Sequence, residues 1–219
     1  SNTNGSITSS VSANPSAGFS IVSYTGTGAN ATVGHGLSSA PEMMIIKSRS
    51  DGAVDWGVYH TALGPTKWVR LNLTSASATA SNVWNNTAPT SSVFSLGSGG
   101  HLNGSSDTEI AYCFHSVDGY SKVGSYTGNG SADGTFVHCG FRPAFVMVKR
   151  TNAAGDSWGI HDATRGTYNV SGPELYANTS EVEGAATRLD FTSNGFKQRS
   201  TGGLMNASGG TYIFLAFAE

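Results

Sequence analysis

The chain has 219 residues and a formal net charge of −2, and only 12% of its residues are charged. That fraction is about half of the value for an ordinary soluble domain, so hydroxyl and amide groups must wet most of the surface. Only Lys149 and Arg150 are adjacent basic residues, which argues against nucleic-acid binding, and no apolar run approaches the about 20 residues that cross a bilayer.

The first half of the chain reads as short strands separated by turns. Residues 1–17 are polar and lack the features of a secretion signal, so we expect a linker or N-terminal extension from a longer chain. Strands are predicted at "FSIVSYTG" from Phe19, "EMMIIKS" from Glu42 and "DWGVYH" from Asp55. Further strands are predicted at "SVFSLG" from Ser92 and at "TEIAYCFHS" from Thr108, a long apolar run typical of a central strand.

The second half shows the same kind of pattern. Strands are predicted at "YSKVGSYTG" from Tyr120, "AFVMVKR" from Ala144 and "TYIFLAFAE" from Thr211. "RLDFTSNGFKQ" from Arg188 alternates apolar and polar residues around Ser-Asn-Gly, which is a hairpin signal. No window has sustained helical periodicity, and residues 171–189 are the only ambiguous stretch.

The two halves also resemble each other. Ser-Tyr-Thr-Gly occurs twice, with Tyr24 and Tyr126 separated by 102 positions, and the Lys47/Lys149 and Trp56/Trp158 pairs keep that spacing. A repeat of this length is domain-sized rather than a solenoid unit. We therefore predict an all-β fold of two tandem, homologous, antiparallel β-sandwich domains of jelly-roll type. The predicted boundaries are 1–17 for the linker, 18–117 for the first repeat and 118–219 for the second.

No catalytic or metal-binding motif stands out. The chain lacks a nucleophile elbow, a zinc-protease motif, a Cys pair at metal spacing and a phosphate-binding loop. Its acidic residues offer several carboxylates for glycoside cleavage, but nothing selects a pair. We predict no enzyme activity, no metal and no cofactor. Cys113 and Cys139 lie beside apolar residues, so buried free thiols are expected.

Several blocks resemble a known kind of module. "SAGFSIVSYTG", "APEMMIIK", "AYCFHSVDGYSKVGSYTGNG" and the ending "YIFLAFAE" are similar to a C-terminal module of tail-fibre-like proteins of tailed phages, often marine phages. The resemblance covers about Ser16 to Glu219. It implies a virion tail component, made in the host cytoplasm, that forms a homotrimer and contacts other tail proteins. It carries no functional residues with it.

The repeat suggests where a ligand would bind. Aromatic residues shared by both halves are core candidates, whereas those without a counterpart are free for another role. Sugar rings stack on aromatic faces while Asn side chains bond their hydroxyls, so the candidates for ligand contact are as follows: Trp68, Trp84, Asn85, Asn86, Tyr168 and Tyr176. Local packing and a subunit interface remain alternatives for the aromatic members of this set.

The leading hypothesis is therefore a phage tail-fibre or receptor-binding module that attaches to a host surface glycan or outer-membrane receptor. The alternatives are a purely structural virion protein, such as a head decoration or fibre-assembly domain, and a bacterial carbohydrate-binding or adhesin module. A hydrolase is the least favoured class.

Overall fold

The computed structural model describes residues 1–219, and strands account for 44% of the chain and helices for 5%. Every strand pair is antiparallel, apart from one isolated parallel bridge between Ile7 and Val33. The fold is therefore all-β, as predicted, and it has β-sandwich character. The chain divides into two compact units, which are described separately.

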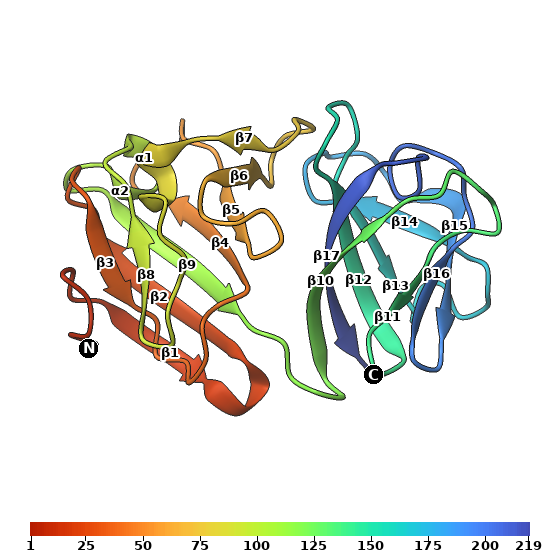
Figure 1. The fold of residues 1–219 in the computed structure, drawn as a ribbon, viewed down its shortest axis with the longest axis horizontal. Coiled ribbons are helices and arrows are strands. Elements are labelled where there is room, and N and C mark those ends of the chain that lie inside the picture. Colours follow the sequence, from red (N-terminus) through yellow and green to blue (C-terminus); the bar gives the residue numbers. More distant parts are fainter. The chain divides into compact units, whose positions relative to one another are not determined.

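The first unit comprises residues 1–71 and 77–116. Its main sheet has seven strands in the order β1-β2-β9-β4-β5-β6-β7 (Figure 1). Their bounds are β1 Ser10–Asn14, β2 Phe19–Thr25, β4 Met43–Ser48, β5 Gly57–His60, β6 Lys67–Arg70, β7 Ala78–Thr79 and β9 Thr108–Phe114. A separate pair is formed by β3 Ala31–Gly34 and β8 Val93–Leu96. The short helices are η1 Pro15–Ala17, α1 Ser81–Trp84 and α2 Gly100–Asn103.

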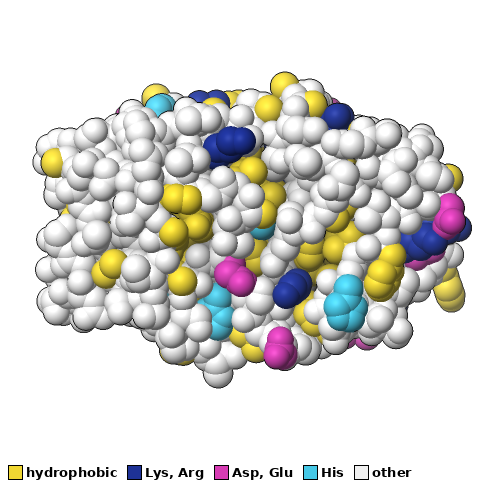
Figure 2. Space-filling view, viewed as in Figure 1, with side chains coloured by type: hydrophobic (Ala, Val, Ile, Leu, Met, Phe, Trp, Pro, Cys, Tyr) yellow, Lys and Arg dark blue, Asp and Glu magenta, His cyan; other side chains and the backbone are white.

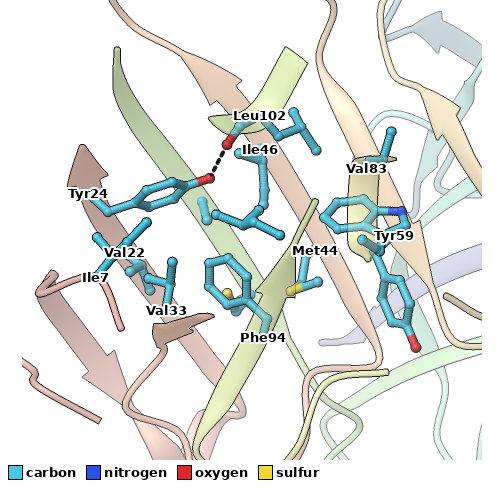
Figure 3. Close-up of a cluster of buried hydrophobic side chains, with 14 of the residues drawn as sticks. Ile7, Val22, Tyr24, Val33, Met44, Ile46, Tyr59, Val83, Phe94 and Leu102 are labelled. Atoms are coloured by element: carbon cyan, nitrogen blue, oxygen red, sulfur yellow. Dashed lines mark hydrogen bonds between the residues drawn. The ribbon is translucent and has the colours of Figure 1, made fainter. Parts of the chain in front are cut away.

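The core of the first unit lies between the main sheet and the β3–β8 pair. Val33 of β3 and Phe94 of β8 are fully buried in one cluster with Val22 of β2 and Ile46 of β4. Figure 3 shows these side chains together, with the hydroxyl of Tyr24 pointing at the carbonyl of Leu102. The apolar runs predicted as strands thus supply the buried faces of a two-layer core.

The N-terminal segment is part of this unit and not a free linker. Strand β1 pairs with β2 over five residues, from Ser10↔Ser23 to Asn14↔Phe19. Ile7 is buried in the core, and the buried Ser9 hydroxyl donates to the Gly34 carbonyl at 2.9 Å. The expectation of a linker over residues 1–17 is therefore corrected. Backbone pairing needs no sustained apolar pattern, so this mostly polar stretch, in which Val11 alone packs against the core cluster, forms a strand along the edge of β2.

The second unit comprises residues 117–219 together with 72–76. Its sheet has eight strands in the order β10-β17-β12-β13-β14-β15-β16-β11 (Figure 1). Their bounds are β10 Ser121–Thr127, β11 Phe136–His138, β12 Pro143–Arg150, β13 Gly159–Asp162, β14 Ser171–Tyr176, β15 Gly184–Thr192, β16 Gly195–Gln198 and β17 Thr211–Ala218. The ambiguous stretch at 171–189 contains β14 and the start of β15, with a non-strand connection over residues 177–183.

The sheet of the second unit folds over itself to enclose its core. Val137 of β11, Phe196 of β16 and Leu189 of β15 belong to one buried cluster with Val146 of β12 and Phe214 of β17. The far end of the sheet thus supplies a second layer above β12 and β17. Long apolar strands β9 and β17 are flanked on both sides in their sheets, as their sequences predicted.

Both cysteines are free and buried, which confirms the prediction for Cys113 and Cys139. Figure 2 shows that the visible surface is largely white, so uncharged polar side chains and backbone dominate it. No helix is long and apolar enough to cross a membrane. No group of three or more His, Cys, Asp or Glu side chains that would hold a metal ion occurs among the described residues.

Candidate functional site

Trp68 and Trp84 are part of the first unit's core. Their relative exposures are 3% and 1%, and both belong to its buried cluster. The indole N–H of Trp84 donates to the Lys67 carbonyl at 3.1 Å, and its ring meets Tyr59 edge-on. The Arg70 guanidinium lies 4.4 Å from the Trp68 ring centroid. Stacking on a sugar would need an open ring face, so these two tryptophans pack locally, and their assignment to ligand contact is corrected.

The other four predicted residues are at least partly accessible, and they are divided between the two units. Asn85 and Asn86 follow α1 in the first unit, are exposed, and have φ angles of 51° and 48°. Tyr168 is 86% exposed in the loop before β14 of the second unit. Tyr176 ends β14, where its half-buried hydroxyl donates to the carboxylate of Glu174.

The second unit contains a shallow polar pocket of about 520 Å³. Three parts of the unit form its wall: the loop between β10 and β11, strand β15, and the segment that follows β16. The lining residues are Ala132, Ala185, Ala186, Thr187, Arg188, Arg199, Ser200, Thr201 and Gly202. The volume lies within the range of about 300–1,000 Å³ that is typical of small-ligand sites. We call it the Arg188–Arg199 pocket.

Two arginines face each other across a strand pair in this pocket. The β15–β16 register pairs Leu189 with Gln198, and the Arg199 N–H donates to the Arg188 carbonyl at 2.6 Å, which continues the ladder by one pair. Leu189 and Gln198 are buried, so period-two alternation directs both arginines outward. Like charges directly opposite one another are unfavourable, and carboxylates offset the repulsion here.

A buried carboxylate holds Arg188 in place. Glu174 is 1% exposed and accepts hydrogen bonds from Arg188 Nε at 2.6 Å and Nη2 at 3.4 Å. Burial alone would lower the pKa of Arg188, but its hydrogen bond to Glu174 raises it. His161 Nε2 lies 3.6 Å from Glu174, and burial lowers the pKa of His161 to about 4, so this imidazole is neutral near pH 7. The Arg188 guanidinium is therefore oriented before any ligand arrives.

A second, smaller hollow of about 180 Å³ adjoins Arg188 on another side. Tyr176, Asp156 and Glu181 contribute to its lining together with Arg188. Tyr176 is thus the one predicted site residue that shares a hollow with the arginine of the main pocket. Asp156 is engaged with Arg150, at 3.2 Å between Oδ2 and Nη1.

The buried amide of Asn206 fixes two walls of the Arg188–Arg199 pocket. Its Nδ2 donates to the Ser131 carbonyl and to the Ser200 carbonyl, each at 2.8 Å, and Asn206 has no exposed surface. Ser131 precedes Ala132 in the loop after β10, and Ser200 follows Arg199. A single side chain therefore sets the separation of the loop wall and the post-β16 wall.

The pocket arginines were not predicted from the sequence, although the signal was present. Arg188 begins the stretch predicted only as a hairpin, and Arg199 directly follows that stretch, 11 positions after Arg188. The two-residue turn at Ser193-Asn194 pairs Thr192 with Gly195, and the same register then places Arg188 opposite Arg199. Counting outward from the turn would have found the pair.

Residues 1–219, the whole chain, match the family described as Domain of unknown function (DUF7483). The chain belongs to this family. Neither the curated proteins nor the solved structures include a match to this DUF7483 chain. The family assignment therefore says nothing of activity, and the function rests on the pocket and on the sequence.

Proposed function

We propose that this DUF7483 chain is a non-enzymatic attachment module of a phage tail fibre that binds a host surface glycan through the Arg188–Arg199 pocket. The observation that carries the proposal is the pocket itself: an open hollow of about 520 Å³ with a preorganised guanidinium, hydroxyl side chains and backbone groups. Saccharides are recognised by such hydrogen-bonding groups. The largely uncharged polar surface and the resemblance to phage tail-fibre modules point in the same direction.

We also propose that the two units are tandem copies of one jelly-roll-like sandwich. The order β2-β9-β4-β5-β6 in the first sheet corresponds to β10-β17-β12-β13-β14 in the second. The β3–β8 pair corresponds to the β11–β16 pair in the same way. Two hydrogen bonds from Tyr hydroxyls also match: Tyr24 donates to the Leu102 carbonyl and Tyr126 to the Met205 carbonyl, each at 2.7 Å.

A structural virion role is the second candidate. It is favoured by the burial of Trp68 and Trp84, because the first unit then offers a glycan only Trp56, which is itself only partly exposed. In this case the chain would serve in fibre assembly or head decoration and bind no ligand. A homotrimer fits both roles, and light scattering of the purified chain would measure the subunit number.

Adsorption to bacterial cells separates the two roles. The labelled wild-type chain is incubated with a panel of bacterial strains, in parallel with Ala185→Trp, which fills the pocket from its exposed rim. Ala53→Trp places the same side chain on an exposed turn of the first unit and is the matched control. We expect at least one strain to retain the wild type and the control but not Ala185→Trp. Equal retention of all three would move the site away from the pocket, and no retention by any strain would favour the structural role.

A further inference from the structure

We propose that the Arg188–Arg199 pocket selects a sugar that carries a carboxylate, so that its ligand is an acidic polysaccharide rather than a neutral one. This inference rests on the proposed function, because it names the ligand class of the same site. Its basis is the arrangement of charges around the two arginines.

Both arginines keep donors available towards the pocket. The hydrogen bonds to Glu174 use Nε and Nη2 of Arg188. Nη1 lies beside the glycine wall, since a Cβ built on Gly202 would be 3.5 Å from it. Arg199 contacts Asp190 through Nε at 3.4 Å, and its side chain is 37% exposed. Terminal guanidinium nitrogens next to an open hollow match the two oxygens of a carboxylate.

Charge balance favours one negative charge on the ligand. Arg188, Arg199 and the nearby Lys197 are partnered by Glu174, Asp190 and Asp133, respectively, so the surroundings are close to neutral. A singly charged carboxylate can bond the guanidinium nitrogens that Glu174 and Asp190 do not use, and it adds only one negative charge to these balanced surroundings. A densely charged sulfated or phosphorylated polymer would also meet the three protein carboxylates. The same balance disfavours a nucleic acid, as does the chain's net charge of −2.

The remaining lining fits the neutral part of a sugar. Thr187 and Thr201 supply exposed hydroxyl groups beside the guanidiniums, and Ala185, Ala186 and Gly202 leave room for a ring. Hydroxyl groups both donate and accept, so they can bond the sugar hydroxyls around the carboxylate.

Matched glycans test the inference directly. Fragments of alginate, hyaluronate and polygalacturonate are immobilised, each beside its carboxyl-reduced form, and dextran sulfate is included as a sulfated polymer. Binding of the full chain is measured by biolayer interferometry. We expect at least one uronate to bind and its reduced form to bind at least tenfold more weakly. Binding that survives reduction, stronger binding to dextran sulfate, or no binding to any uronate would overturn the inference.

Two variants localise the effect. Arg199→Gln removes a pocket charge from a partly exposed side chain, whereas Lys197→Gln removes a charge from the neighbouring strand β16 without lining the pocket. We expect Arg199→Gln to weaken uronate binding at least tenfold and Lys197→Gln to change it less than threefold. Equal weakening would indicate general electrostatic attraction and refute selection by the pocket.

The outcome is separable from that of the proposed function. If cells retain the wild type but not Ala185→Trp, and no uronate binds, the attachment role stands and the acidic ligand is wrong. If neither cells nor any glycan retains the correctly folded chain, both proposals fail.

Discussion

The two units carry the same backbone hydrogen bond with opposite side-chain chemistry. In the first unit, the Gly97 N–H donates to the Val83 carbonyl at 2.7 Å, directly after β8. At the corresponding place in the second unit, the Arg199 N–H donates to the Arg188 carbonyl at 2.6 Å, directly after β16. Val83 is buried in the core, whereas the arginines face outward. The same backbone contact therefore lies beside packed core side chains in the first unit and beside a charged pocket in the second.

Space explains why the first unit has no such pocket. A Cβ on Gly97 would lie 2.3 Å from the backbone of Asn82, so no side chain fits there. Gly97 bonds back to the short helix α1, whereas Arg199 bonds back to the long strand β15. Helix α1 brings its backbone too close for a larger residue. Function is therefore expected where the units differ, and the shared contacts are expected to hold each unit together.

The largest expected effect comes from replacing Trp84, which packs in the core of the first unit. Trp84→Ala removes a fully buried ring together with its hydrogen bond to Lys67, so we expect the free energy of unfolding to fall by about 3–5 kcal/mol. Urea unfolding followed by circular dichroism measures it. Uronate binding by the folded variant should be unchanged, because the pocket lies in the other unit. Reduced glycan binding with normal stability would restore Trp84 as a ligand contact.

The strands of the core were predictable from the sequence because their apolar side chains are buried. Apolar runs such as Met43–Ser48 and Thr211–Ala218 are buried because they lie inside a sheet with a second layer above. The surroundings of Trp68 and Trp84 misled the prediction, since polar neighbours do not fix where a side chain points. Strand β6 is only four residues long and α1 is one turn, so neither has enough residues to show a period.

The candidate site was less predictable than the fold because it depends on contacts distant in sequence. Ala132, Arg188 and Ser200 meet only after β15 pairs with β16 and Asn206 bridges the two loops. The local sequence pattern indicates each strand, but it does not show which outward-facing side chains line the same pocket. Tyr176 was predicted, yet it lines the adjoining smaller hollow and bonds Glu174.

The next contrast concerns a buried position where the first unit has a carboxylate and the second has a ring. Glu109 of β9 pairs with Tyr24, whereas Tyr212 of β17 pairs with Tyr126 and stacks on it at 4.9 Å. Glu109 has no exposed surface, and burial, followed by the nearby charge of Asp107, raises its pKa from 4.5 to about 7. The second unit has no titratable carboxylate at the matching position.

Glu109 should make the first unit less stable as the pH rises. Below pH 4.5 the Glu109 carboxyl is protonated in both the folded and the unfolded chain. Between pH 4.5 and 7 it ionises only in the unfolded chain, which lowers the free energy of unfolding. Above pH 7 the carboxyl is ionised in both, and the loss in free energy of unfolding is complete. We expect the free energy of unfolding of Glu109→Gln, relative to that of the wild type, to increase by about 3 kcal/mol from pH 4 to pH 8. Urea unfolding at both pH values measures this difference. A gain that does not change with pH would show that the group titrates normally.

A smaller and equal loss is expected from the buried amides that the units share. Asn103 Nδ2 donates to the carbonyls of Ala29 and Gly97, at 2.6 and 2.8 Å, as Asn206 does to its two loops. Replacing either by Ala removes the donor of two carbonyls that lie in buried or partly buried surroundings, at a cost of about 2 kcal/mol in its unit. Asn4→Ala, on the exposed N-terminal segment, is the control.

These two variants should nevertheless differ in ligand binding. Asn206→Ala loosens the walls of the Arg188–Arg199 pocket and should weaken uronate binding, whereas Asn103→Ala should leave it unchanged. Stability and binding are measured on the same samples by unfolding and interferometry. If both variants bind alike, the pocket walls do not depend on the amide.

The smallest effects separate two hydroxyls that otherwise look the same. Tyr24 donates to the Leu102 carbonyl, so Tyr24→Phe should lower the free energy of unfolding by about 1 kcal/mol for one lost hydrogen bond. Tyr126 donates to Met205 and also accepts from Nε2 of the buried Gln198 at 3.0 Å. Tyr126→Phe therefore leaves two buried groups unpaired and should cost about twice as much. Equal losses in urea unfolding would mean that Gln198 finds another partner, and the second unit would then be no more dependent on its tyrosine than the first.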